Sequence, residues 1–313
     1  MSAPLSLPST RIDIGVCTFR RPELEQTLRS LAALALPDGV SVRVIVADND
    51  ASPSARPLVD RLRPSLPFDL LYVHCPAGNI SIARNACIQN SNGDFLAFID
   101  DDEVASTEWL LLLLMIAEAT GADAVLGPVK ARYGADAPAW MRRGDFHSTA
   151  PVWVGDEIRT GYTCNVLLRR ASPAVAGRRF NLALGRSGGE DTDYFTHLHR
   201  AGGRIAFAAD AFVEEPVPPG RARLSWLARR RFRMGQTHGR LLAGQAPMTK
   251  RPAQLSLAAM KASFCLLAGL ACAPFAIQRN RYGLRAVLHI GVVSGLIGVR
   301  EIRQYGELGA TSP

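Results

Sequence analysis

The chain has 313 residues, of which 48% are hydrophobic and 20% are charged, and this composition excludes disorder for most of its length. The length allows one large domain or a domain with an appendage. The six cysteines show neither a C-x-x-C pairing nor a metal-ligand spacing with histidine. This absence disfavours a zinc site and favours free thiols in a reducing compartment.

Strand-like and helix-like patterns alternate along the first 120 residues. The expected strands are apolar or β-branched runs at 12–17, 42–47, 70–74 and 95–99, and the expected helices lie at 21–35, 80–88 and 106–120. This alternation predicts an α/β fold with a doubly wound, largely parallel central sheet. Ligands bind at the carboxyl ends of the strands in such sheets.

Three polar clusters directly follow expected strands. They are "CTFRR" (17–21), "ADND" (47–50) and "DDDE" (100–103). Because the carboxyl ends of parallel strands lie at one edge of a sheet, the topology predicts that the three clusters converge there.

The "DDDE" cluster is the candidate metal site. Oxygen ligands suit a hard divalent cation, either Mg²⁺ or Mn²⁺. Asp100 and Asp102 point to the same side of an extended backbone, so one can bind metal while the other holds a neighbouring hydroxyl. The alternative is a solvated acidic turn before a helix.

The other candidates also have two interpretations each. Asp48 either accepts hydrogen bonds from a ribose or base, or closes an Asx turn. Thr18 offers a hydroxyl and Arg21 a phosphate partner. Arg84 lies in an otherwise small and apolar helix, where it requires an anionic partner unless it reaches the surface.

The second half of the chain is less regular. Strand-like sequence covers 161–170 and 204–213, and a helix is expected within 188–203. There "GGED" places Asp191 at a helix start behind two glycines, where a closing loop can deliver a general base. The alternative is a carboxylate that only complements the helix dipole.

The composition changes after residue 220. Residues 216–313 carry 13 Arg and 2 Lys against two Glu, a net charge of +13, and no acidic residue lies between Pro216 and Arg300. A basic stretch, 221–240, precedes uncharged runs of 16 and 14 residues at 262–277 and 286–299. These runs are shorter than the roughly 20 residues that span a bilayer, so helices lying in or dipping into one leaflet are expected. Apolar segments next to a polybasic stretch favour an anionic membrane surface over nucleic acid.

Taken in order, these motifs resemble the family 2 glycosyltransferases of the GT-A fold. The likeness covers about residues 11–215 and is greatest to bacterial exopolysaccharide enzymes of the succinoglycan type. It is carried by T-x-x-R-P (18–22), "VADND" (46–50), G-x-x-x-x-A-R-N (78–85), "DDD" (100–102) and "GED" (189–191). Two positions depart from the pattern: Arg20 stands where Asn is frequent, and Glu103 where Asp is frequent.

The resemblance implies an inverting transfer of a sugar from a nucleotide diphosphate sugar to a hydroxyl, with Mg²⁺ or Mn²⁺ as cofactor. Asp191 would be the catalytic base, and Asp102 with Asp100 would bind the metal. Contacts to the nucleotide-sugar would come from Thr18, Arg21, Asp48, Asp50, Arg84, Asp100 and Asp101. Acceptor contacts are expected from Trp140, Tyr162, Asn165 and Glu190.

Two regions and a location follow. Residues 1–220 would form the glycosyltransferase domain, and 221–313 a membrane-associating region for a lipid-linked saccharide acceptor. This places the protein on the cytoplasmic face of the bacterial inner membrane, peripheral or monotopic. One alternative is a metal-dependent nucleotidyltransferase, which would release pyrophosphate. The other is a non-catalytic nucleotide-binding membrane module, in which Asp191→Asn would leave every function intact.

Overall fold

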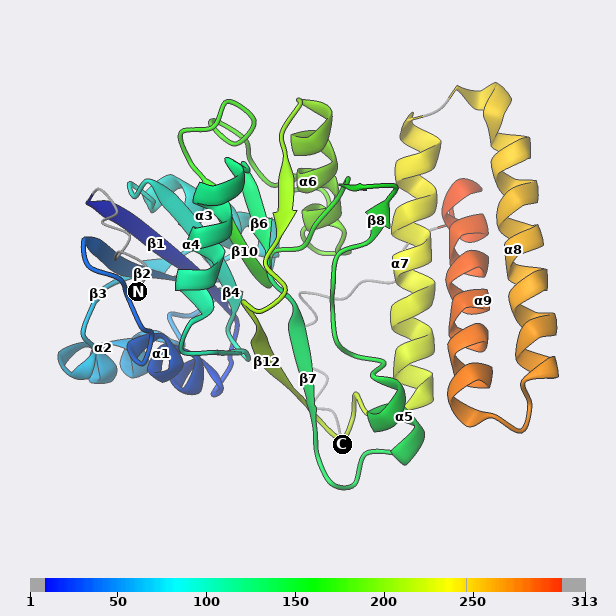
Figure 1. Cartoon of the computed structure of the whole chain (residues 1–313), viewed down its shortest axis with the longest axis horizontal. Helices are drawn as coiled ribbons and strands as arrows, with labels where there is room; N and C mark the ends of the chain where they lie inside the picture. Colours follow the sequence, from blue (N-terminus) through cyan, green and yellow to red (C-terminus); the bar gives the residue numbers. More distant parts are fainter. Residues whose placement is uncertain (1–8, 246, 300–313) are drawn as a thin grey trace, which may run out of the picture.

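The computed structural model describes residues 9–245 and 247–299. Its centre is a seven-stranded sheet in the order β11-β6-β10-β4-β1-β2-β3 (Figure 1). The strands are β1 (Thr10–Thr18), β2 (Val40–Asp48), β3 (Asp69–His74), β4 (Phe95–Asp100), β6 (Ala124–Leu126), β10 (Asn165–Arg169) and β11 (Ile205–Phe207). The four strands expected in the first half fall within β1 to β4, and the α/β class is confirmed.

The sheet is parallel except at one strand. β1 pairs in parallel with both β2 and β4, and β2 pairs in parallel with β3. β10 runs antiparallel to its two neighbours, β4 and β6. The strand expected at 161–170 is therefore shorter than predicted, and it interrupts the parallel order.

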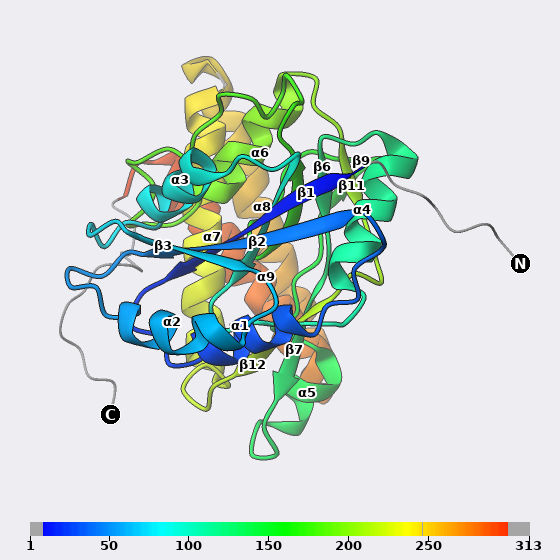
Figure 2. The same cartoon turned by 90° about the vertical axis from the view of Figure 1, so that its left-hand side faces the viewer.

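Helices cover both faces of the sheet (Figure 2). α1 (Leu24–Ala32), α2 (Arg56–Leu62) and α4 (Trp109–Thr120) bury their apolar sides against one face. α3 (Ile80–Asn90) and α6 (Glu190–Arg200) cover the other. β2 shows why the sequence dictates this: Val46 packs on the first face and Ala47 on the second, and both are fully buried. A run apolar on both sides is typical of a strand covered twice.

A smaller sheet lies beside the carboxyl edge of the central one. It consists of β5 (Val104–Ala105), β12 (Val213–Val217) and β7 (Val129–Tyr133). The segment expected as one strand over 204–213 is therefore divided between β11 and β12. Short elements fill the remaining connections: α5 (Ala139–Gly144), the β8 (Trp153–Val154) and β9 (Glu157–Ile158) hairpin, and 3₁₀ turns η1 (Arg63–Ser65) and η2 (Met248–Lys250).

Three long helices follow the sheets. α7 (Leu224–Gln245), α8 (Arg251–Ala271) and α9 (Ala276–Leu296) lie side by side, with α8 outermost (Figure 1). α8 and α9 are longer than the uncharged runs because Lys261, Arg281 and Arg285 lie within them. In the described part of the chain one helical stretch, Met248–Ala271, has the length and apolar composition needed to cross a membrane. The expectation that both segments are too short to span is therefore wrong for this one.

α7 and α9 cross at very short distance through four glycines. Gly235 and Gly239 of α7 face Gly291 and Gly295 of α9, and a Cβ at any of them would overlap backbone atoms of the opposite helix. Two small-xxx-small motifs thus let the two backbones touch. The crossing fixes α9, and α8 packed on it, to α7.

α7 also packs on the α/β region. Leu227 of α7 and Leu284 of α9 share an apolar cluster with Met141 and Phe146 from the α5 region. The predicted boundary after residue 220 falls just before α7, and α7 contacts both regions. Residues 1–8 and 300–313 of the two predicted regions lie outside the described residues.

Candidate active site

The strand ends align at one edge of the sheet, as the sequence predicts. Thr18 at the end of β1 is in register with Asp48 at the end of β2, and Cys17 is in register with Asp100 at the end of β4. The three polar clusters therefore start side by side, and the predicted convergence is confirmed.

An acidic cluster occupies this edge. Asp100 interacts electrostatically with the carboxylates of Asp102, Glu215 and Asp191. Glu103 is a further acid beside Asp100, so it does not neutralise this negative charge. Burial first, and then the neighbouring carboxylates, raise the pKa of Asp100 to about 7 against the opposing effect of Arg84. Buried like charges of this kind favour a bound cation or a bound proton.

Arginines from two distant segments approach the same cluster. Arg21, which follows β1, lies with its Nη2 3.7 Å from Asp102 Oδ2 and its Nε 3.9 Å from Asp101 Oδ1. Arg221, which precedes α7, lies 3.7 Å from Asp102 and donates to Glu215 at 2.7 Å. The sequence did not single out Arg221 or Glu215, although the basic stretch starts six residues after the acidic pair 214–215.

Arg84 and Glu190 form a buried ion pair between α3 and α6. Nη1 of Arg84 donates to Oε1 of Glu190, and Glu190 Oε2 is buried without a hydrogen-bond partner in the described residues. Arg84 also lies in the field of Asp191 and Asp100. The anionic partner that the sequence demanded for Arg84 is thus Glu190, with the other two carboxylates close by.

Asp191 lies in the first turn of α6, next to this pair. Its side chain is half-buried, and its Oδ1 accepts from the backbone N–H of Thr192 at 2.7 Å. The helix begins after Gly189, which has φ +92°. This position puts the carboxylate at the positive end of the helix dipole.

The Gly188–Gly189 turn before Asp191 packs directly on α7. Nη1 of Arg233 donates to the carbonyl of Ser187 at 3.1 Å, and a Cβ on Gly188 would overlap this guanidinium. Thr237, one turn further along α7, lies against Gly189. α7 therefore helps to form the site. The sequence predicts only a membrane segment here, because the charge of the basic stretch does not show which side of the helix faces the site.

The two candidates at the end of β2, Asp48 and Asp50, form hydrogen bonds with other residues of the chain. Asp48 is fully buried, and its carboxylate accepts from the N–H groups of Asp50 (3.1 Å) and Ala55 (2.8 Å) and from Tyr72 Oη (2.7 Å). Asp50 binds Arg20 Nε at 2.8 Å. In this structure Asp48 closes an Asx-type turn, which is the alternative that the sequence left open.

The four acceptor candidates have different places. Tyr162 lies in the field of Glu103 and Cys164, and its hydroxyl donates to Gly127 O at 2.8 Å. Trp140 lies in α5 and packs edge-on against Phe146, with ring centroids 4.9 Å apart. Glu190 is the buried partner of Arg84.

Asn165 is held inside the fold. Its side chain is fully buried, its Oδ1 accepts from Trp109 Nε1 at 2.8 Å, and its Nδ2 donates to the carbonyls of Pro128 and Ala211. These bonds join β10 to its surroundings, and a contact of Asn165 with the acceptor stays a prediction.

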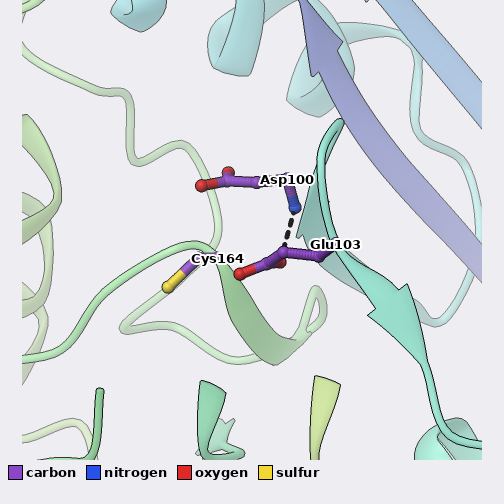
Figure 3. A group of neighbouring side chains, drawn as sticks. All are labelled: Asp100, Glu103 and Cys164. Atoms are coloured by element: carbon purple, nitrogen blue, oxygen red, sulfur yellow. Dashed lines mark hydrogen bonds between the residues drawn. The ribbon is translucent and has the colours of Figure 1, made fainter. Parts of the chain in front are cut away.

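The residues present fit a hard divalent cation. Asp100, Glu103 and Cys164 bring one ligand atom each to within 4.8 Å of one another (Figure 3). Carboxylate oxygens suit Mg²⁺ or Mn²⁺, whereas a thiol suits softer metals. Of the two predicted ligands, Asp100 belongs to this group. Asp102 does not belong to it and lies beside Arg21 and Arg221 instead. Glu103 is not among the predicted ligands. Glu103 also accepts from the backbone N–H of Asp100 at 2.9 Å, which fixes the turn.

An α/β sheet with an acidic cluster at its carboxyl edge fits the class of the glycosyltransferases. Residues 13–173 match the model of "Glycosyl transferase family 2", and the chain belongs to that family and is a glycosyltransferase. It is 64% identical over 301 residues to the succinoglycan biosynthesis protein ExoM of Rhizobium meliloti, covering 96% of this chain and 97% of that protein.

Solved structures share the fold. The mannosyltransferase PcManGT from Pyrobaculum calidifontis, in complex with GDP-Man and Mn²⁺, superposes with a TM-score of 0.63 at 20% identity, covering 94% of this chain and 89% of that one. S. aureus TarS 1-349 in complex with UDP-GlcNAc superposes with a TM-score of 0.51 at 15% identity, covering 88% and 90%.

Proposed function

We propose that this glycosyltransferase moves a sugar from a nucleotide diphosphate sugar to a hydroxyl of a lipid-linked saccharide, with inversion, in succinoglycan biosynthesis. The polysaccharide is suggested by the name of the relative at 64% identity. The donor class is supported by structural neighbours of the same fold that hold UDP-GlcNAc or GDP-Man.

One observation carries the proposal: Arg84 interacts electrostatically with both Asp100 and Asp191. The acids of the sheet edge and the acid of α6 therefore lie close to one cation. The first group suits the donor and the second suits the acceptor. An enzyme that performs a single displacement needs one base on the face opposite the leaving group.

The reaction then follows from these positions. The acceptor oxygen forms a bond to the anomeric carbon while the bond from that carbon to the diphosphate oxygen breaks. Asp191 takes the proton from the acceptor hydroxyl. Arg21 and Arg221 face the place where the diphosphate gains negative charge, and they stabilise it electrostatically. One displacement on one carbon inverts its configuration.

A divalent cation would be held by Asp100 and Asp102, with Glu103 as a further oxygen ligand. Bound there, it supplies Lewis-acid neutralisation of the leaving diphosphate.

The C-terminal helices would place this site at a membrane. α8 exposes large apolar side chains to solvent, among them Leu257, Met260, Phe264, Leu266, Leu267 and Leu270. Apolar area beside arginines and without acids suits an anionic lipid surface. We assign residues 1–220 to the glycosyltransferase domain and 221–313 to membrane association. α7 serves both, and the protein would lie on the cytoplasmic face of the inner membrane, peripheral or monotopic.

The test is a donor screen with the full chain extracted in detergent. Nucleotide-sugars are supplied one at a time with Mg²⁺ or Mn²⁺ and with a lipid extract, and the released nucleotide is identified. Release of a nucleoside diphosphate that depends on Asp191 is expected. Release of pyrophosphate would instead identify a nucleotidyltransferase.

A further inference from the structure

A cavity of about 230 Å³ opens at the seam between α5, α7 and α9. Its lining combines apolar Phe146, Leu284 and Leu288 with three arginines, Arg231, Arg281 and Arg285. The glycosyl-transfer mechanism uses none of these residues. A pocket lined by both apolar and cationic side chains fits a molecule that is anionic at one end and apolar beside it.

Arg231 has no ion-pair partner among the described residues. It is half-buried, and among the described residues its recorded electrostatic neighbours are two further arginines, Arg230 and Arg285. Burial lowers the pKa of its guanidinium, and the two neighbouring arginines lower it further. A partly desolvated cation that faces other cations has a strong preference for an external anion.

The other charged side chains that line the cavity, Arg281 and Asp145, do not act as an anionic partner for Arg231. Arg281 donates from Nη2 to the carbonyl of Gly144 at 3.0 Å, which holds it at the rim. Of the described residues that line the cavity, Asp145 alone is acidic. Its Oδ1 is turned toward the backbone N–H of Ser148, at 3.4 Å, and no guanidinium of the cavity lies within ion-pair distance of it in the described chain.

The surroundings of the cavity indicate where the anion comes from. The connection from α8 to α9 lies at the same end of the molecule as α5 (Figure 1). Large apolar side chains near that connection are mostly exposed: Leu267 at 67%, Leu270 at 72% and Phe275 at 61%. Apolar side chains that enter a leaflet at this end would bring neighbouring arginines to the depth of the lipid phosphates.

We propose that the α5–α7–α9 cavity is a binding site for the phosphate of an anionic membrane lipid, held by Arg231 and Arg285. This inference rests on the membrane association in the proposed function, and it names the chemistry and the residues of one specific lipid contact. Arginine suits the role because its planar fork binds two phosphate oxygens at once.

The test compares charge-conserving variants of the full chain. Arg231→Lys with Arg285→Lys keeps the net charge but removes the fork, whereas Arg223→Lys with Arg229→Lys makes the same change at two exposed arginines of the same basic stretch outside the cavity. Flotation with vesicles of phosphatidylcholine, with and without phosphatidylglycerol, measures binding. We expect the cavity variant to partition about tenfold more weakly into the phosphatidylglycerol vesicles, and the control to change less than about twofold.

Several results would overturn the inference. Equal binding by both variants and the wild type would show that only diffuse charge matters, while membrane association would stand. A wild-type protein that floats with neither vesicle would remove the membrane association as well. Thermal protection by inorganic phosphate that depends on Arg231, with vesicle binding unchanged, would assign the cavity to free phosphate instead. Sugar transfer in detergent should be equal in all three proteins.

Discussion

The guanidinium of Arg84 on α3 is paired with the carboxylate of Glu190 in the first turn of α6, and both side chains are almost completely buried, at 7% and 4% exposure. The pair joins two helices on the same face of the sheet. It also holds the start of α6 beside the acids of β4, because Arg84 lies in the field of Asp100 and of Asp191. The position of Asp191 therefore depends on the ion pair between Arg84 and its neighbour Glu190.

Glu190→Gln should destabilise the protein and slow it. The change leaves a buried guanidinium without its counter-charge, for which a loss of about 3–5 kcal/mol in unfolding free energy is typical. Denaturant unfolding measures it. The matched control is Glu157→Gln, which breaks an exposed pair with Arg159 and should change stability by less than about 1 kcal/mol. Equal effects of the two changes would contradict the role of the buried pair.

Asp191→Asn should abolish transfer without abolishing donor binding. The amide keeps the shape of the side chain but cannot accept the proton, and a general base contributes roughly 10²- to 10⁴-fold in rate. Initial rates and donor affinity, measured on the same preparation, separate the two effects. Asp193→Asn, two residues further along the helix, is the control and should retain most activity. Full activity in Asp191→Asn would exclude this residue as the base.

Much of the sheet follows from the sequence because β1 to β4 are short apolar runs that each end in a polar cluster. The sequence around Arg84 also predicts an anionic partner, since an arginine among Ala83, Ala86 and Cys87 would otherwise be an unpaired buried charge. Which anion it finds depends on tertiary structure: Glu190 lies 106 positions away. No local pattern encodes that distance.

Other site residues are also held by contacts between segments that are distant in the sequence. The carboxylate of Asp48 and the amide of Asn165 look equally free in the sequence, but the fold surrounds both with backbone groups. Likewise the charge of the 221–240 stretch predicts a surface, whereas Arg221 and Arg233 face the site. The charge pattern of a segment does not show how its helix is oriented. The orientation of α7 in the fold decides which arginines face the site.

The stabilisation of the protein by Mn²⁺ should increase with pH. The pKa of Asp100 is raised from 3.8 to about 7. In the metal-free protein its contribution to stability is therefore fully present below about pH 4 and is lost as the pH rises through about 7. A metal competes with the proton, so the rise in Tm caused by Mn²⁺ should be small near pH 6 and large near pH 8.

Thermal unfolding with and without Mn²⁺ across this range is the measurement. In Asp100→Asn the Mn²⁺ effect should be small and independent of pH. A Tm shift in the wild type that is equal at both ends of the range would show that Asp100 does not bind the metal.

Gly188→Ala should reduce activity more than the backbone strain of an alanine at a positive φ would by itself. Gly188 has φ +87°, and its missing Cβ leaves space for the guanidinium of Arg233. Gly177→Ala is the matched control, because Gly177 also has a positive φ, +74°, but faces open space. Both variants carry the backbone strain of about 1 kcal/mol, and only the first displaces α7 from the turn before Asp191. We expect kcat to fall in Gly188→Ala and to stay near wild type in Gly177→Ala; equal kcat values would separate α7 from catalysis.

The stereochemistry of the transferred sugar tests the central claim most directly. The full chain in detergent is given its donor and acceptor, and the anomeric configuration of the new linkage is read by NMR from its one-bond coupling before any further step occurs. A single displacement with Asp191 as base predicts a configuration opposite to that of the donor. A product with the configuration of the donor would contradict it, because retention requires a second displacement.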